Sequence, residues 1–263
     1  MVLSSFIQTL ALFLVRENNM TISIVIPAYN EEHYLGACLE SVLAEVARAG
    51  VEAEVIVVNN ASTDQTKEVA QKYAGVRVVD ESRKGLVWAR KAGWDATQSD
   101  LVANIDADVR MPTGWLTTVV RTFEQDTRLA ALSGPYRYYD LSWRQNVLVA
   151  LFYLPGYLFD AVAQPLTGRA TMLQGGNFIL KRAAWDKAGG FDTSIAFFGE
   201  DADIARRISA RGRVRWTWSL PMHTSGRRLQ KEGIITTGYR YAINLFWIHL
   251  TGTPHTTTYT DHR

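Results

Sequence analysis

Two aspartates separated by one residue have side chains whose type and spacing could do chemistry. Asp106 and Asp108 follow the apolar run 101–103, which predicts a buried strand that delivers both acids to the edge of a sheet. Because side chains alternate along a strand, the two carboxylates are predicted to point the same way. Like charges that close repel, so they need a cation or several hydrogen-bond donors, and a hard divalent metal bound to a phosphate is one suitable partner. The alternative is a solvated turn before a helix that begins at Pro112.

The composition is that of an ordinary globular protein. The 263 residues are 47% hydrophobic and 21% charged, and the formal net charge is +2. This balance argues against disorder and gives no general attraction to nucleic acid, so we expect no nucleic-acid partner. Cys38 is the single cysteine, which excludes an intrachain disulfide and a cysteine metal site. It also agrees with a reducing compartment, so we expect a cytoplasmic protein.

Apolar, β-branched stretches alternate with helical patterns along the first half of the chain. Strands are predicted at residues 21–27, 54–58 and 76–79 and in the run before Asp106, with helices between them. Short connections of this kind indicate an α/β fold with a mostly parallel central sheet and helices on both faces. Such sheets bind ligands at the carboxyl ends of their strands.

Polar residues follow three of these strands at the point where each ends. Tyr29 and Glu31 follow the first strand, Asn59 to Ser62 follow the second, and the two aspartates follow the fourth. We therefore expect a ligand site at this edge of the sheet. Neither G-x-G-x-x-G after the first strand nor G-x-x-x-x-G-K-[ST] occurs, so a dinucleotide-binding fold and a P-loop nucleotidase are disfavoured.

The second half of the chain is less regular. A strand is predicted at residues 129–133, and a helix that begins near Glu200 and Asp201 is predicted to end near Gly212. The uncharged run 145–159 contains Pro155-Gly156, which is expected to break a helix there. The interrupted run is then too short to span a bilayer unaided.

Six short motifs together resemble those of the family 2 glycosyltransferases, which have the GT-A fold. They occur in the family's order and spacing, and the resemblance covers about Thr21 to His223. In this chain they are Pro27-Ala28-Tyr29-Asn30-Glu31, Val57-Val58-Asn59-Asn60-Ala61-Ser62-Thr63-Asp64, Lys84-Gly85, Asp106-Ala107-Asp108, Gly175-Gly176-Asn177 and Gly199-Glu200-Asp201. The resemblance implies a single GT-A (Rossmann-like) domain and a transferase that moves a sugar from a nucleotide donor with inversion of the anomeric centre.

The resemblance also implies a role for each matching residue. The base and ribose of a UDP- or GDP-sugar would contact Pro27, Tyr29, Glu31, Asn59, Ala61 and Ser62. The ribose and diphosphate would lie near Asp106 and Ala107, with Lys84 and Arg90 as neutralising cations. Asp108 would ligate Mg²⁺ or Mn²⁺, with His223 as a further metal contact. Gly176 and Asn177 would hold donor and acceptor in line, and Asp201, beside Glu200, would be the catalytic base.

The sequence departs from the family pattern at Asn59, where many relatives have aspartate. An aspartate at this position accepts a hydrogen bond from the ring N–H of uracil or guanine. Asn59 can accept the same bond through its side-chain oxygen, but without the charge that strengthens it. The base of the donor therefore stays open.

Several of these residues have simpler interpretations. Glu200 and Asp201 could stabilise a helix dipole, His223 could be a structural residue, and Lys84 and Arg90 could be solvated surface charge. An inactive relative that binds a glycan or a protein partner is the alternative function, although Asp106, Asp108 and Asp201 are intact. A nucleotidyltransferase would need a glycine-rich loop with a lysine after the first strand.

The resemblance divides the chain into three parts. Residues 1–19 are an N-terminal extension of uncertain role, and 20–225 form the transferase domain. Its nucleotide-binding half is expected at about 20–110 and its acceptor half at about 111–225. Residues 226–263 are a C-terminal helical segment with an apolar face and nearby Arg227, Arg228, Lys231 and Arg240. That segment either completes the core or lies on an anionic membrane at its inner face, where a lipid-linked acceptor would replace a soluble glycan.

Overall fold

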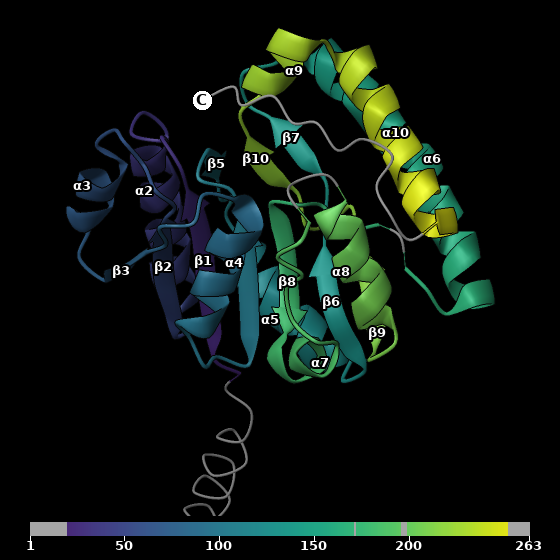
Figure 1. The fold of residues 1–263 in the computed structure, drawn as a ribbon, viewed down its shortest axis with the longest axis horizontal. Coiled ribbons are helices and arrows are strands. Elements are labelled where there is room, and N and C mark those ends of the chain that lie inside the picture. The colour runs from purple at the N-terminus through teal and green to yellow at the C-terminus, as the bar shows by residue number, and fades with distance from the viewer. Residues whose placement is uncertain (1–19, 171, 196–198, 252–263) are drawn as a thin grey trace, which may run out of the picture.

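The central sheet of the computed structural model has seven strands in the order β3-β2-β1-β4-β8-β6-β9 (Figure 1). The structure describes residues 20–170, 172–195 and 199–251. The strands are β1 (Ile22–Ala28), β2 (Ala53–Asn59), β3 (Val76–Asp80), β4 (Leu101–Ile105), β6 (Leu129–Ser133), β8 (Asn177–Lys181) and β9 (Arg213–Trp216). Within this sheet β8 is antiparallel to both neighbours and the other pairs are parallel. The predicted mostly parallel α/β sheet is thus confirmed.

Helices cover both faces of this sheet, as the sequence pattern predicts. One face packs against α2 (Leu35–Ala49), α3 (Thr66–Gln71) and α5 (Trp115–Gln125), and the other against α4 (Leu86–Asp95), α7 (Arg182–Lys187) and α8 (Glu200–Ser209). Strand β1 shows the reason. Ile24 and Ile26 lie in the first core and Val25 lies in the second, so residues on both faces of the strand have to be apolar.

A smaller sheet lies at the carboxyl edge of the large one. It consists of β5 (Val109–Arg110), β10 (Met222–Thr224) and β7 (Tyr136–Tyr138), with β10 in the middle. Strand β10 is antiparallel to β5 and parallel to β7. The short helix α9 (Arg227–Glu232) follows directly. This sheet brings together three chain segments that are far apart in sequence.

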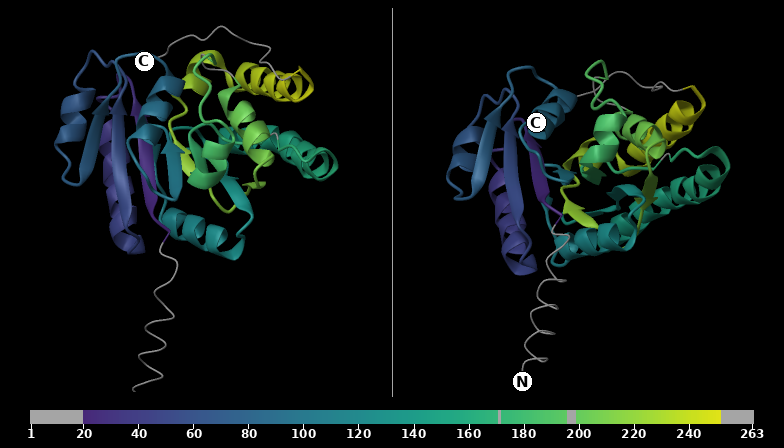
Figure 2. Two further views of the ribbon diagram at one scale, coloured as in Figure 1. Left: turned by 60° about the horizontal axis from the view of Figure 1, so that its bottom comes forward. Right: turned by 90° about the horizontal axis from the view of Figure 1, so that it is seen from below.

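Helices α6 (Trp143–Thr167) and α10 (Ile234–Thr251) lie side by side along one flank of the domain (Figures 1 and 2). A Cβ atom at Gly238 of α10 would lie 2.9 Å from the ring of Phe152 of α6, so the close approach needs glycine. The predicted helical segment after residue 226 is present as far as Thr251. The predicted extension at residues 1–19 lies outside the described residues, as do residues 252–263.

Helix α6 is continuous through Pro155-Gly156, so the predicted break is wrong. A proline inside a helix removes one hydrogen bond and costs about 3 kcal/mol. Here a capping box at Ser142 and Gln145 secures the start of the helix. Buried Val149, Gly156 and Ala163 hold its inner side against the domain. Tertiary packing therefore outweighs the local signal.

Candidate active site

The two aspartates of the central motif lie in a turn after the end of β4. The strand ends at Ile105, and the Val109 amide donates to the Asp106 carbonyl oxygen at 3.4 Å. The carboxylates consequently have different partners. Asp106 Oδ2 accepts from the Tyr136 hydroxyl at 2.7 Å, whereas Asp108 Oδ2 lies 3.1 Å from Arg227 Nη2. Strand alternation, from which a common direction of both side chains is predicted, does not apply, because the strand ends before either residue.

Arg227, the first residue of α9, joins two of the predicted donor motifs. Its Nη2 group donates to Glu31 Oε1 as well as pairing with Asp108, and its guanidinium carbon lies 4.6 Å from the centre of the Tyr34 ring. The Glu31 side chain is 2% exposed and the Asp108 side chain 12%. The sequence pattern placed Arg227 only in a C-terminal basic cluster, since nothing local connects it to residues 31 and 108.

The surroundings of Asp108 fit a hard divalent cation. The Thr224 hydroxyl lies 3.3 Å from Asp108 Oδ1, so a carboxylate and a hydroxyl oxygen meet there. Mg²⁺ and Mn²⁺ prefer oxygen ligands, and in nucleotide sites they take most of the others from phosphates and water. Within the described ranges, no three or more His, Cys, Asp or Glu residues form a group that could hold a metal by themselves.

His223, the other predicted metal ligand, is the neighbour of Thr224 on β10. Its backbone is opposite Arg110 on β5 and Arg137 on β7. Burial and the charge of Arg137 lower the pKa of the imidazole, so it is neutral at pH 7, the state that a metal ligand requires. The hydroxyl of Thr224, the residue after His223, lies 3.3 Å from Asp108 Oδ1, and the metal contact of His223 stays a prediction.

Arg90 of α4 connects the aspartate turn to the predicted catalytic acids. It is 2% exposed, and its Nη1 group donates to Glu200 Oε2 at 2.6 Å. Its Nη2 group donates to the Gly175 carbonyl oxygen and lies 3.7 Å from Asp106 Oδ1. The interpretation of Arg90 as solvated surface charge is therefore wrong. Its predicted contact with the diphosphate stays a prediction.

Glu200 and Asp201 form the first turn of α8 at the edge of the site. Burial raises the pKa of Glu200 to about 7 and also raises the pKa of Asp201. Asp201 Oδ1 accepts from the Ala202 amide at 2.9 Å. A Cβ atom at Gly175 would lie 3.7 Å from Asp201 Oδ2, so this oxygen faces the glycine turn. A carboxylate with a raised pKa is a stronger base, which suits proton removal from a hydroxyl.

The turn at Gly175-Gly176-Asn177 supports the site in two ways. A Cβ atom at Gly176 would overlap the Tyr136 hydroxyl and the Asp106 carboxylate, so only glycine lets these groups meet. Asn177 is fully buried, accepts from Trp115 Nε1 at 3.0 Å, and donates to the carbonyl oxygens of two other loop residues. Its amide therefore holds the turn in place, and its predicted contact with substrate stays a prediction.

The loops after β1 and β2 are joined to each other. Asn30 and Ala61 have positive φ angles of 51° and 57°, a strained conformation that clusters at functional sites. The Asn30 amide donates to Ser62 Oγ at 3.2 Å, and Asn30 Oδ1 accepts from the Thr63 amide at 2.9 Å. Lys84 covers the Tyr29 ring at 4.0 Å and donates to its hydroxyl at 2.8 Å. Three predicted donor-site loops thus meet at one edge.

Asn59 is the last residue of β2, and one polar atom of its side chain makes no hydrogen bond to the described residues. Its Nδ2 group donates to Asp80 Oδ1 at 2.9 Å, and Lys67 pairs with the other Asp80 oxygen. Asn59 Oδ1 is buried and has no hydrogen-bond donor among the described residues. The sequence pattern did not single out Asp80. Nearby, Pro27 and Val58 are register partners in the ladder, and Ala107 is 3% exposed.

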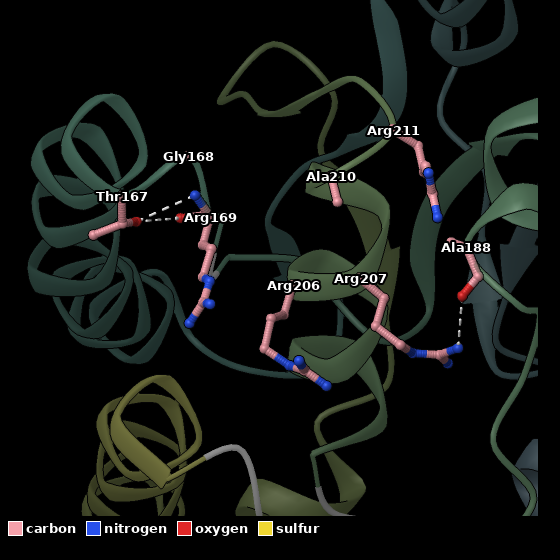
Figure 3. Close-up of a pocket in the computed structure, with 8 residues that line it drawn as sticks. All are labelled: Thr167, Gly168, Arg169, Ala188, Arg206, Arg207, Ala210 and Arg211. Atoms are coloured by element: carbon pink, nitrogen blue, oxygen red, sulfur yellow. Dashed lines mark hydrogen bonds between the residues drawn. The ribbon is translucent and has the colours of Figure 1, made fainter.

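A separate pocket of about 420 Å³ lies at the far end of α8 (Figure 3). It is lined by Arg169, Arg206, Arg207 and Arg211 together with small residues. It contains none of the predicted donor or catalytic residues.

The mostly parallel sheet, the aspartate turn after β4 and the two acids at the start of α8 agree with a GT-A glycosyltransferase. The chain belongs to glycosyl transferase family 2, whose family model matches residues 23–189. It is therefore a family 2 glycosyltransferase.

Two relatives and one solved structure resemble this chain over different lengths. The dodecaprenyl-phosphate galacturonate synthase of Rhizobium johnstonii is 29% identical over 158 residues, which are 57% of this chain and 44% of that protein. The undecaprenyl-phosphate 4-deoxy-4-formamido-L-arabinose transferase of Photorhabdus laumondii is 32% identical over 110 residues, 40% of this chain and 34% of that one. The mannosyltransferase PcManGT of Pyrobaculum calidifontis, in complex with GDP-Man and Mn²⁺, has a TM-score of 0.64 at 20% identity. That match covers 86% of this chain and 65% of the other. The matches to the two relatives span less than half of their lengths.

Proposed function

We propose that the protein transfers a sugar, with inversion, from a UDP- or GDP-sugar to a lipid-linked or glycan acceptor, and that Asp201 is the base. The observation that carries this proposal is the meeting of Asp106, Arg90 and Asp201 around the Gly175-Gly176 turn. Asp106 lies at the predicted donor site, and Asp201 is a half-buried carboxylate with a raised pKa.

In the proposed reaction the acceptor oxygen attacks the anomeric carbon as its proton moves to Asp201 Oδ2. The bond between that carbon and the diphosphate oxygen breaks, and the nucleoside diphosphate leaves with the bonding electrons. Attack opposite to the leaving group inverts the anomeric centre. Burial of Asp201 favours its protonated form after the transfer, so the environment of the base assists the forward step.

A divalent cation held by Asp108, with Thr224 beside it and His223 as a further candidate, would neutralise the departing diphosphate. In this structure Arg227 forms an ion pair with Asp108 Oδ2. This ion pair would have to break before Asp108 Oδ2 binds a cation, and the guanidinium would then be available to pair with a phosphate. Lys84, held over Tyr29, is a second cation at the same edge.

Asn59 supports recognition of the base. Its buried Oδ1 atom, which has no donor among the described residues, would accept from the ring N–H of uracil or guanine. The names of the Rhizobium and Photorhabdus relatives include polyprenyl phosphates. Those names support a lipid-linked acceptor at the inner face of the cell membrane.

The proposal is tested by calorimetric titration of UDP and GDP, each with Mn²⁺ and with EDTA. We expect one nucleotide to bind in a metal-dependent manner, with loss of binding in Asp108→Ala and retention in Asp201→Asn. Release of the nucleoside diphosphate from the matching donor should fall about 10²–10⁴-fold in Asp201→Asn, the usual contribution of a positioned base. Asp95→Asn, an exposed change on α4, is the control and should behave as the wild type. Failure of folded wild-type protein to bind either nucleotide would contradict the proposal.

A further inference from the structure

The outward side of α6 is a continuous apolar surface. Six large aliphatic residues recur at intervals of three or four and are between 43% and 80% exposed: Val147, Leu151, Leu154, Leu158, Val162 and Leu166. Spacing of this kind places them on one side of a helix. The buried residues of the same helix, such as Val149, Gly156 and Ala163, lie on the opposite side. Exposed apolar stripes this long mark interaction surfaces.

Helix α6 is long and apolar enough to cross a bilayer, but its connections prevent it from doing so. Its 25 residues would extend about 37 Å, more than the ~30 Å hydrocarbon core. The chain enters α6 from β7 at the carboxyl edge of the domain and returns into β8, which lies between β4 and β6 in the central sheet. Both ends therefore belong to one folded unit, and a crossing would place them on opposite sides of the membrane.

The inner side of α6 is bound to that same unit along its length. Tyr153 donates to Gln174 Oε1 at 2.7 Å, Asp160 Oδ1 accepts from the Met172 amide at 3.2 Å, and Gln164 Nε2 donates to the Val214 carbonyl oxygen at 2.9 Å. The helix consequently lies flat, with one side on the domain and the other outward.

Cationic and aromatic side chains border this apolar surface. Exposed Arg144 lies at the start of α6. At its other end is the pocket of Arg169, Arg206, Arg207 and Arg211 (Figure 3). The carboxylate of Asp203 pairs with Arg206 and Arg207, which leaves this group with an excess of positive charge. Trp143 is 72% exposed, as suits an aromatic ring at a lipid–water boundary.

We infer that the outward side of α6 docks in the interfacial region of an anionic phospholipid bilayer, with the helix axis in the membrane plane. The aliphatic stripe enters the headgroup–acyl boundary, and exposed Arg144, Arg169 and Arg211 bind lipid phosphates at the two ends of the helix. Charge complementarity favours this occupant, because a symmetric contact between two copies would oppose surfaces of the same sign. The membrane surface thus lies on α6, between β7 and β8, in addition to the predicted C-terminal segment.

This orientation has a consequence for the acceptor, which rests on the proposed function. Tyr153 on the inner side of α6 accepts from the Tyr136 amide, and the Tyr136 hydroxyl donates to Asp106. Two hydrogen bonds, through Tyr153 and Tyr136, therefore connect α6 to Asp106 of the donor motif. On the proposed function, a lipid-linked acceptor would therefore approach the donor motif from the side of α6.

The test is flotation of the full chain with vesicles of phosphatidylglycerol and phosphatidylcholine, and with phosphatidylcholine alone. The variant Leu151→Glu/Leu158→Glu changes two exposed positions and lowers the net charge by two. Lys72→Glu, on an exposed residue after α3, lowers it by the same amount and is the matched control. Circular dichroism checks that each variant is folded. Vesicle binding requires neither donor nor acceptor, so its failure is distinguishable from failure of the transferase proposal.

We expect wild type and Lys72→Glu to bind the anionic vesicles and the double variant to bind at least about tenfold more weakly. Higher salt should weaken the wild-type binding, because the arginine contribution is screened. Absence of wild-type binding at low salt would overturn the inference. A dimer in light scattering that dissociates in the double variant, without vesicle binding, would also overturn it by assigning the surface to a second copy.

Discussion

Replacement of Arg227 by glutamine should make Asp108 a better site for a divalent cation. Arg227 Nη2 lies 3.1 Å from Asp108 Oδ2, and the two side chains are 19% and 12% exposed. Opposite unit charges about 4 Å apart interact by about 4 kcal/mol at an effective dielectric constant of about 20. Partial exposure and the other contacts of both groups reduce this, so we expect a net gain of about 1.4–2.8 kcal/mol. That gain corresponds to Mn²⁺ binding roughly 10–100-fold tighter in the absence of nucleotide.

The same substitution should lower the stability of the fold. Glu31 is 2% exposed and loses the guanidinium to which it is bonded. Breaking a buried ion pair by removing one partner costs about 3–5 kcal/mol. Because Arg227 is 19% exposed, we expect a smaller loss of about 2–3 kcal/mol in the free energy of unfolding by urea.

The assay is the electron paramagnetic resonance signal of free hexaaqua Mn²⁺ during titration with protein. Arg228→Gln is the matched control, because it removes the same charge from the next residue, which pairs with Glu232 at 3.0 Å. Its Mn²⁺ affinity should equal that of the wild type. The double variant Asp108→Ala/Arg227→Gln should lose the gain. Equal or weaker Mn²⁺ binding by Arg227→Gln would refute the idea that the guanidinium and the cation compete for Asp108.

Three further predictions concern the buried network. Arg90→Met should destabilise the fold by about 3–5 kcal/mol in urea unfolding, because it leaves Glu200 buried without its cation. The double variant Arg90→Met/Glu200→Leu should lose less stability than Arg90→Met alone, because it leaves no unpaired charge. A double variant that is less stable than the single variant would contradict this. Burial raises the pKa of Glu200 from 4.5 to about 7, so the folded protein holds a proton on Glu200 that the unfolded chain loses at lower pH. The stabilisation that this proton gives to the folded state is complete below pH 4.5 and is lost as the pH rises to about 7. Relative to the wild type, Glu200→Gln should lack this decline in thermal unfolding scans, and a parallel pH dependence would disprove the assignment. Gly176→Ala should impair nucleotide binding because its Cβ atom would overlap Tyr136, whereas Gly175→Ala makes ordinary contacts and should be milder; equal affinities in calorimetry would count against the steric argument.

Local patterns were enough to predict the layers of the fold and the edge that carries the site. Strands β1 and β2 are runs of β-branched residues because both faces of the sheet are covered, and such runs can be recognised without knowing what covers them. Parallel strands share their carboxyl ends, so residues after β1, β2 and β4 had to meet. This is why Tyr29, Asn59 and Asp106 could be assigned to one site from sequence position.

The contacts inside the site depend on which segments pair, and that information is not local. Arg227 meets Asp108 because β10 pairs with β5, and Tyr136 meets Asp106 because β7 lies on the other side of β10. A single shift in either register would separate these groups, yet no short-range pattern specifies it. The same holds for Arg90, since a charged residue on a helix is surface or core according to what packs over it.

By itself the sequence determined the α/β architecture, the edge of the sheet where the ligand site is predicted, and the acids available for chemistry. Those features follow from periodicity and from residue type, which act over a few residues. Only the tertiary structure decided that Arg227 pairs with Asp108, that Arg90 is buried in an ion pair with Glu200, and that α6 continues through Pro155. In each case the free energy of long-range packing and ion pairing exceeds the local preference of the chain.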